Sequence, residues 1–302
     1  MAGNFTPNQI RDTRLWRRLN RPFSTTQSSE LAQCFARSLP DFCKIASDRM
    51  KLMPVLHGEF TLHDDVHLLR VTELMGLVIP DQVLEGVLNP VEIALLILAA
   101  HFHDVGMICD SEESETIRDS SEFKVSREKW IAEQAGFRDV LEKTEGSAAG
   151  KDAQILSEFE QGAFVRFVRA VHADRSAEYV SSKLGSKSEL VVGTGNLAPS
   201  LALLCQSHNW HPDKIAEPHG LFLDKLIGTY PVNLQYLAII LRLADILDFD
   251  RERTPDELYK SINFRSPISI SEWEKHRQVD GWVVGHGQVR FECECHRPEE
   301  RL

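Results

Sequence analysis

Apolar residues recur at helical spacing along most of the chain, from about residue 30 to residue 247. The clearest helix start is Asn89-Pro90-Val91-Glu92, which places an N-cap residue, a proline at the first helical position and a capping-box glutamate in order. The apolar run that follows, Ile93–Ala100, ends in the polar sequence HFHDVGM at residues 101–107. The pattern predicts a mainly α protein whose buried central helix ends in polar residues.

A two-residue alternation replaces the helical period near the C-terminus, where Val289, Phe291, Cys293 and Cys295 alternate with polar residues. This pattern is typical of a half-buried strand, and the preceding sequence Gly-His-Gly at 285–287 predicts a hairpin turn after a strand at 282–284.

The same patterns predict three parts of the chain. The first is an N-terminal arm and capping helix over residues 1–45, of which residues 1–28 form a loosely tethered arm. The second is a helical domain over 46–250, with an exposed helical insertion at 110–160 and a mobile turn at 146–150. The third is a C-terminal extension over 251–302 that contains a small β-hairpin.

Composition limits the function classes. The chain has 302 residues, with 34 Lys and Arg against 45 Asp and Glu, and the net charge of −11 disfavours binding nucleic acid through bulk positive charge. Six cysteines in a chain of this length predict reduced thiols and a cytoplasmic location. The start of the sequence lacks the layout of a signal peptide, and the run Ile93–Ala100 is too short to cross a bilayer, so we expect no membrane association.

Six polar residues near the ends of predicted helices occupy positions on the apolar faces of those helices. A buried carboxylate is costly unless it is paired or bound to a metal, so the set is explained most simply as metal ligands. Taken singly, each histidine has the alternative role of a core residue bonded to a carbonyl, and each aspartate that of a helix cap. Gly106 would let the backbone turn away after the ligands. The six residues are His67, His103, Asp104, His172, His208 and Asp245.

The mixture of imidazole and carboxylate ligands favours divalent Mn, Fe, Co, Ni or Zn over Ca. The sequence Cys293-Glu-Cys295-His296 offers too few ligands for a further metal site, so core packing is the favoured role of its cysteines. Asp248 and Asp250 either orient ligands or solvate a helix end, and His101 is expected to be structural.

These residues resemble a known pattern. His67, then His103-Asp104, then Asp245 in "LADILD" resemble the H…HD…D pattern of the HD-domain metal-dependent phosphohydrolases, over roughly residues 57–250. The stretches "FTLHDDVH", "LAAHFHDVGM", "VHADRSAEYV", "LCQSHNW" and "LRLADILDFDRERTP" are similar to the HD domains of bacterial conflict (anti-phage defence) systems, which are often followed by a GHKL-type ATPase. The chain lacks the Gly-Tyr-Pro triplet that HD-GYP proteins have after their HD pair.

The resemblance implies an HD-domain helical bundle that binds one or two divalent transition metal ions. His172 and His208 look like the extra histidines of HD proteins with two metals, and Asp104 would bridge the two ions. The implied reaction is hydrolysis of a phosphate ester or anhydride of a nucleotide, a cyclic or oligonucleotide signal, or single-stranded nucleic acid. Asp104 is then the central catalytic residue, Arg175 would contact the substrate phosphate, and His63 would donate a proton to the leaving group or cap a helix.

A second function stays open at this stage. The chain could be a catalytically silent HD sensor or interaction module that works with a GHKL-type ATPase domain or protein. The exposed terminal strand favours partnering, because an unpaired strand edge invites another strand, and a homo-oligomer is also open.

Overall fold

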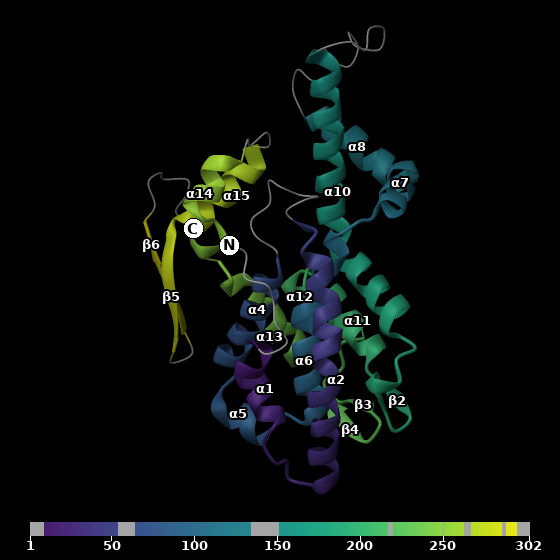
Figure 1. Cartoon of the computed structure of the whole chain (residues 1–302), viewed down its shortest axis with the longest axis vertical. Helices are drawn as coiled ribbons and strands as arrows, with labels where there is room; N and C mark the ends of the chain where they lie inside the picture. The colour runs from purple at the N-terminus through teal and green to yellow at the C-terminus, as the bar shows by residue number, and fades with distance from the viewer. Residues whose placement is uncertain are drawn as a thin grey trace.

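The computed structural model describes residues 9–53, 64–133, 151–216, 220–249, 251–262, 267–285 and 288–294, and the fold is mainly α, as predicted. Helices form the body of the protein and small antiparallel hairpins lie at its surface (Figure 1). The helices that build the body are α1 (Arg14–Leu19), α2 (Thr26–Met50), α4 (Asp65–Val78), α5 (Asp81–Gly86), α6 (Pro90–Phe102), α11 (Ala198–Ser207), α12 (Pro212–Ala216) and α13 (Leu234–Leu247).

Helix α6 is the centre of the core, and every one of its residues is buried. It starts as predicted: the Asn89 side chain accepts from the backbone N–H of Glu92, whose side chain accepts in return from the N–H of Asn89. Helices α1, α2, α4, α11 and α13 all pack against α6. The window Pro90–Met107 is long and apolar enough to cross a membrane, which corrects the shorter length expected from Ile93–Ala100, and all of it is buried inside the protein.

The N-terminal segment is packed more tightly than the sequence indicated. Residues Ile10, Leu15 and Leu19 have 0–1% of their surface exposed and belong to the main core, so the expectation of a loosely tethered arm is wrong for residues 9–19. A short 3-10 helix, η1 (Gln9–Asp12), precedes α1. Helix α2 runs through the boundary expected at residues 45 and 46, because its apolar stripe continues to Met50 against α6.

The described part of the insertion is helical. It contains α7 (Ser111–Asp119), which has no buried residue, and α8 (Ser121–Glu133). The long helix α10 (Lys151–Leu184) projects beyond the body at its N-terminal end (Figure 1). A separate small cluster that includes Phe123, Phe164 and Val168 joins α8 to α10. The turn expected at 146–150 lies outside the described residues.

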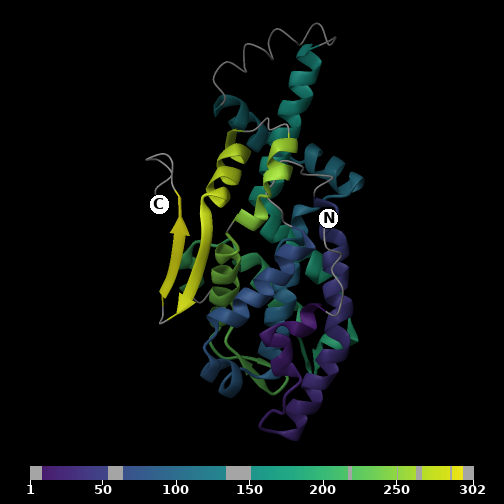
Figure 2. The same cartoon turned by 60° about the vertical axis from the view of Figure 1, so that its left-hand side comes forward.

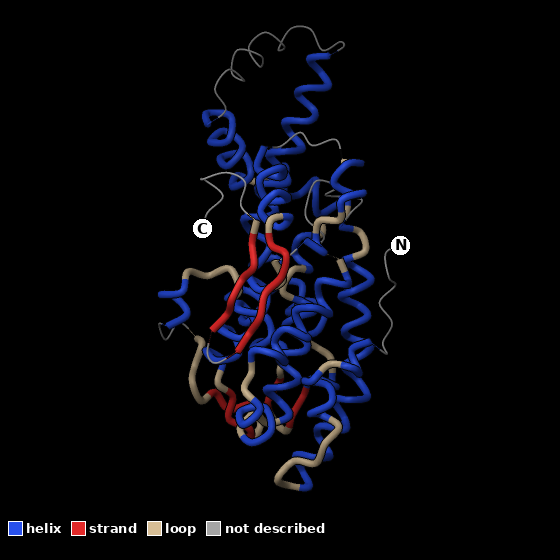
Figure 3. Tube along the Cα trace, turned by 90° about the vertical axis from the view of Figure 1, so that its left-hand side faces the viewer, coloured by secondary structure: helices blue, strands red, loops and turns tan. Residues whose placement is uncertain are grey.

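Within the described ranges, three short hairpins complete the fold, together with α14 (Asp256–Ser261) and α15 (Pro267–Arg277). Strands β1 (Val191–Val192) and β2 (Gly195–Asn196) pair, as do β3 (Lys225–Ile227) and β4 (Tyr230–Val232). The predicted C-terminal hairpin consists of β5 (Val279–Gly285) and β6 (Gln288–Cys293), and Gly285 pairs with Gln288. It lies along one side of the helical body (Figures 2 and 3), with Trp282, Val284 and Val289 partly buried against the main core.

The inward-facing pattern expected for the last strand is only partly correct. Val289 packs against the core, but Phe291 is 42% exposed and Cys293 is exposed. Core packing therefore does not explain Cys293, and Cys295 and His296 lie outside the described residues. The five described cysteines carry free thiols.

Candidate metal centre

The six residues singled out in the sequence come together at one place in the helical body. His67 lies in the first turn of α4, and His103 and Asp104 follow the last residue of α6. The other three come from α10, from the end of α11 and from the last turn of α13. The set therefore combines five helices that are far apart in the sequence: His67, His103, Asp104, His172, His208 and Asp245.

Four of these residues form a first group of donor atoms. His67 Nε2 lies 3.3 Å from His103 Nε2, and these nitrogens are 3.6 and 3.4 Å from Asp104 Oδ2. Asp245 Oδ1 is 3.5 Å from His67 Nε2 and 3.6 Å from His103 Nε2. The group thus presents two imidazole nitrogens and two carboxylate oxygens to a common point.

The other oxygen of Asp104 belongs to a second group. Asp104 Oδ1 lies 3.3 Å from His172 Nε2 and 3.6 Å from His208 Nε2, and these two nitrogens are 2.9 Å apart. Asp104 is therefore shared by both groups and directs a different oxygen to each. This is the arrangement of a carboxylate that bridges two neighbouring cation sites.

The histidine rings are held so that Nε2 faces the centre. The Nδ1–H groups of His103, His172 and His208 donate to the carbonyl three residues earlier, at 2.9, 2.6 and 2.5 Å. A carbonyl oxygen only accepts, so each Nδ1 carries a proton, and in the neutral ring Nε2 then has its lone pair. In His67 the partner of Nδ1 is the carboxylate of Asp248, at 2.5 Å. Four lone pairs aimed at two points are suited to binding cations.

The spacing of the donors fits a metal ion. Ligand atoms about 2.1 Å from one ion lie about 3.0–3.4 Å from one another in octahedral or tetrahedral geometry. The first group has separations of 3.3–3.6 Å between its nitrogens and oxygens. Two triads, His67–His103–Asp104 and Asp104–His172–His208, have all their donor atoms within 4.8 Å of one another. In addition, α6, α11 and α13 all direct their C-terminal ends, which carry partial negative charge, to this centre.

The pKa values show that the centre attracts positive charge. Burial lowers the pKa of His103, but the charge and hydrogen bond of Asp104 outweigh it and hold this pKa well above its ordinary value. Burial raises the pKa of Asp104, but His103 and the hydrogen bonds from His172 and His67 hold it well below the usual range. For His208, burial and the charges of His103 and His172 lower the pKa to about 4, so this ring is neutral.

Access to the centre is one-sided. The side chains of His67, His103 and His208 are at most 5% exposed, whereas that of Asp245 is 28% and that of His172 is 12% exposed. A small molecule would therefore approach between α13 and α10.

Gly106 has a structural role different from the one expected. Its backbone is not left-handed, so conformational freedom does not explain the glycine. A Cβ at this position would lie 2.2 Å from the His172 carbonyl oxygen and 2.5 Å from the Ser176 nitrogen, both in the backbone of α10. Gly106 N also donates to Ser176 Oγ at 2.9 Å. The glycine thus allows η2 (Val105–Met107), the turn after the ligands, to touch the helix that carries His172.

Arg175 and Arg49 hold this turn from two sides. Arg175 donates to the carbonyls of Gly106 at 2.9 Å and Ile108 at 3.0 Å, and Arg49 donates to those of Val105 at 3.1 Å and Ile108 at 2.7 Å. These partners give Arg175 a structural role that the sequence did not indicate, and its contact with substrate phosphate stays a prediction. Arg49 was missed because it lies on α2, far from every ligand in the sequence.

Glu113 joins the two arginines to the insertion. Its Oε2 lies 3.2 Å from Arg49 and 3.5 Å from Arg175, and it also accepts from the backbone N–H of Asp110, the N-cap of α7. The start of the insertion is therefore attached to the turn that carries Asp104.

The remaining candidate residues have structural contacts or lie outside the described residues. His101 is buried and donates from Nδ1 to Ile97 O at 2.9 Å, which confirms its structural role. Burial lowers its pKa to about 4. His63, the expected proton donor or cap, lies outside the described residues, as does Asp250. Arg242, which the sequence did not single out, donates to His208 O at 3.0 Å and fixes the end of α11.

Asp248 is fully buried and orients His67. Burial raises its pKa, but the hydrogen bond from His67 and the charges of Arg253 and Arg70 outweigh burial and hold the pKa at about 2. Arg253 is itself buried and donates to Asp248 O at 3.0 Å.

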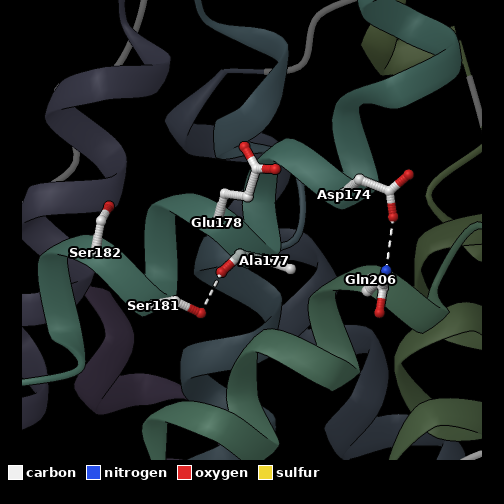
Figure 4. Close-up of a pocket in the computed structure, with 6 residues that line it drawn as sticks. All are labelled: Asp174, Ala177, Glu178, Ser181, Ser182 and Gln206. Carbon is white, nitrogen blue, oxygen red and sulfur yellow. Dashed lines mark hydrogen bonds between the residues drawn. The ribbon is translucent and has the colours of Figure 1, made fainter.

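An open pocket is lined by residues of α10 and α11 (Figure 4). Gln206 donates to Asp174 Oδ1 at 2.7 Å across it, and Glu178 is the other carboxylate in its lining. The pocket includes none of the six predicted ligands, so the chemistry of the protein is assigned to the buried centre.

Comparison with protein families matches residues 57–301 to HD-CE. The match includes all six residues of the centre and the C-terminal extension. Comparisons with curated proteins and with solved structures gave no match.

Proposed function

Because the chain belongs to the HD-CE family, within the HD superfamily, we propose that it is a metal-dependent phosphohydrolase. The observation that carries this proposal is the bridging position of Asp104, whose two oxygens face two separate groups of histidines. Two cation sites joined by a carboxylate are suited to phosphate ester or anhydride hydrolysis.

The residues that would hold the ions follow from the geometry. His67, His103, Asp104 and Asp245 would hold the first ion, and Asp104, His172 and His208 the second. Mixed nitrogen and oxygen donors suit Mn, Fe, Co, Ni or Zn. When bound, such ions make a water molecule more acidic and neutralise the charge of a phosphoryl group. Among the described residues the second group has three protein donors, which leaves room for substrate oxygens.

The chain's own residues contribute orientation and exclusion of water. The four imidazoles are fixed by their Nδ1 bonds, so the donors need no rearrangement when substrate arrives. The apolar surroundings of α6 keep water from the inner side of the centre. Proton donation by His63 and phosphate contact by Arg175 are part of this proposal and await direct test.

We propose a nucleotide-type substrate: a nucleotide, a cyclic or oligonucleotide signal, or single-stranded nucleic acid. The net charge of −11 supports a small nucleotide, because long nucleic acids are bound mainly through positive charge. The sequence resemblance to conflict-system HD domains supports a place in cytoplasmic anti-phage defence.

Substitution of the bridging aspartate tests the enzyme. The Mn²⁺-loaded protein should release phosphate or cleave a phosphodiester from at least one member of a panel of nucleotides and cyclic dinucleotides. Asp104→Ala removes a ligand from both sites and should abolish this turnover while helical content, measured by circular dichroism, is unchanged. The matched control is Asp213→Ala, an exposed aspartate on α12 whose loss should leave turnover unchanged. Wild-type protein that is folded, metal-loaded and inert on the whole panel would refute the enzyme.

One observation favours the second function, an interaction module that works with a GHKL-type ATPase. Ile239, Leu243 and Ile246 are 52%, 36% and 55% exposed and share one face of α13, the helix that carries Asp245. An apolar face of this kind often marks a protein contact. In that case Asp104→Ala should impair partner binding rather than turnover, which a pull-down with such an ATPase would measure.

A further inference from the structure

His67 differs from the other three ligand histidines in what holds its ring. The last carbonyls of a helix have no intrahelical partner, and His103 and His208, at the C-caps of α6 and α11, donate to such carbonyls. His67 lies in the first turn of α4, where the carbonyl three residues earlier, that of Asp64, accepts from the N–H of Leu68 at 3.4 Å. Its Nδ1 takes a partner from another part of the chain.

That partner is Asp248, 181 residues away in the sequence. Its Oδ2 lies 2.5 Å from His67 Nδ1, and the carboxylate has no exposed surface. Asp248 is the C-cap of α13, three residues after Asp245. A carboxylate that accepts from a ligand histidine fixes the ring and increases its electron donation to a cation, an effect that a neutral carbonyl produces more weakly.

Two arginines keep this carboxylate in place. Arg70 Nε lies 2.9 Å from Asp248 Oδ1, and Arg253 Nε lies 3.6 Å from Oδ2. Arg70 is one turn after His67 on α4, and Arg253 comes from η4 (Arg251–Arg253), the start of the C-terminal extension. The charge of Asp248 is thus balanced inside the protein, and one oxygen remains directed at the ring.

We propose that Asp248 is a positioning residue that sets the affinity of the first ion site through His67. The second site has no such carboxylate, because His172 and His208 donate to backbone carbonyls. The first site should therefore keep its ion at metal concentrations at which the second has lost its own. The inference rests on the proposed function only in requiring that the centre binds divalent cations.

The effect of Asp248 on the affinity of the first site can be measured by calorimetric titration with Mn²⁺ in a His172→Ala chain, in which only the first site remains. Adding Asp248→Asn keeps the size of the side chain but removes its charge, and should weaken Mn²⁺ binding by about 10- to 100-fold. In a His67→Ala chain the same substitution should have little further effect, because no ring is left to orient. Asp280→Asn is the matched control, since its carboxylate pairs with Arg251 at 3.4 Å and not with a ligand.

A second variant separates positioning from a purely structural role. Arg253→Gln disturbs the same charged network but leaves the carboxylate on His67, so it should weaken Mn²⁺ binding less than Asp248→Asn does. Thermal unfolding of each metal-free variant reports the structural cost, which the two substitutions are expected to share. Equal losses of Mn²⁺ affinity in the two variants would overturn the positioning role.

The remaining outcomes are also decisive. Unchanged Mn²⁺ affinity on adding Asp248→Asn to the His172→Ala chain, or an equal loss in the His67→Ala chain, would overturn the inference while leaving the proposed function intact. A wild-type chain that binds no divalent ion would overturn both. Mn²⁺ binding that depends on Asp248 in a protein without hydrolase activity would support the inference and refute the proposed function.

Discussion

Gly106→Ala should empty the second ion site and leave the first ion bound. The added methyl group would meet the His172 oxygen at 2.2 Å, the Ser176 nitrogen at 2.5 Å and Arg175 Cβ at 2.8 Å. Two of these atoms belong to the backbone of α10 and cannot rotate away as the end of a side chain would. Non-bonded carbon contacts are comfortable at about 3.5 Å, so η2 and α10 must move apart by roughly 1 Å.

This displacement has a stability cost and a larger functional one. Overpacking of this kind costs about 1–3 kcal/mol of unfolding free energy. Asp104 directly precedes η2 and moves with it, whereas His172 stays with α10. Metal–ligand distances tolerate changes of only about 0.2 Å, so a shift of roughly 1 Å should empty the second site. The first site also has Asp104 displaced, but it keeps three other donors, His67, His103 and Asp245, so it should retain its ion with reduced affinity, whereas the second site keeps only His172 and His208.

Equilibrium dialysis with Mn²⁺ followed by metal analysis measures the number of ions bound, and urea unfolding measures stability. We expect two ions for the wild type and one for Gly106→Ala. Gly162→Ala is the control on the same helix, because a Cβ there meets no atom within 4 Å. A Gly106→Ala protein that binds two ions with wild-type affinity and unfolds at the wild-type urea concentration would refute the reasoning.

Three further predictions follow from the site and the core. His172→Ala and His208→Ala should each lose the second ion and keep the first, and metal analysis that finds no ion left would contradict this. Arg175→Gln should lower the unfolding free energy by about 1–3 kcal/mol, because it removes charged hydrogen bonds to two carbonyls; unchanged stability with a raised KM would instead support phosphate contact. Burial raises the pKa of Glu92 although two backbone N–H groups oppose it. The contribution of protonated Glu92 to stability is therefore complete below the unfolded pKa of 4.5 and is lost as the pH rises through the folded pKa. Urea unfolding of the wild type and of Glu92→Gln should show that the unfolding free energy of the wild type, relative to the variant, falls over that pH range.

The sequence predicted the centre because its ligands violate the helical pattern. His67 and His172 interrupt apolar stripes, and His103-Asp104 ends a wholly apolar helix, so burial and polarity conflict at positions that can be seen without a structure. The capping box at Asn89 likewise consists of neighbouring residues, and the helix begins where it predicts. The C-terminal hairpin was found from its period and turn residues.

The sequence did not predict interactions between distant segments that have ordinary composition. Arg49 and Arg175 hold the carbonyls of one turn, but an arginine on a helix has no local sign of its partner. Gly106 was explained by its own backbone, whereas its role depends on how closely α10 approaches. The N-terminal residues 9–19 have a polar, arginine-rich sequence, yet Leu15 and Leu19 are buried because α1 packs on α4 and α6.

The way in which the ligand rings are oriented affects how such a centre can be transplanted or lost in evolution. His103, His172 and His208 each take their orientation from a carbonyl three residues earlier in the same helix, so each is a self-contained module of four residues. A designer could copy these modules into another helical bundle one helix at a time. The His67 module consists of two segments 181 residues apart, and both must be copied together. Substitution of Asp248 alone during evolution would therefore leave a protein that keeps all six ligand residues in its sequence but in which the ring of His67 is no longer oriented toward the ion site.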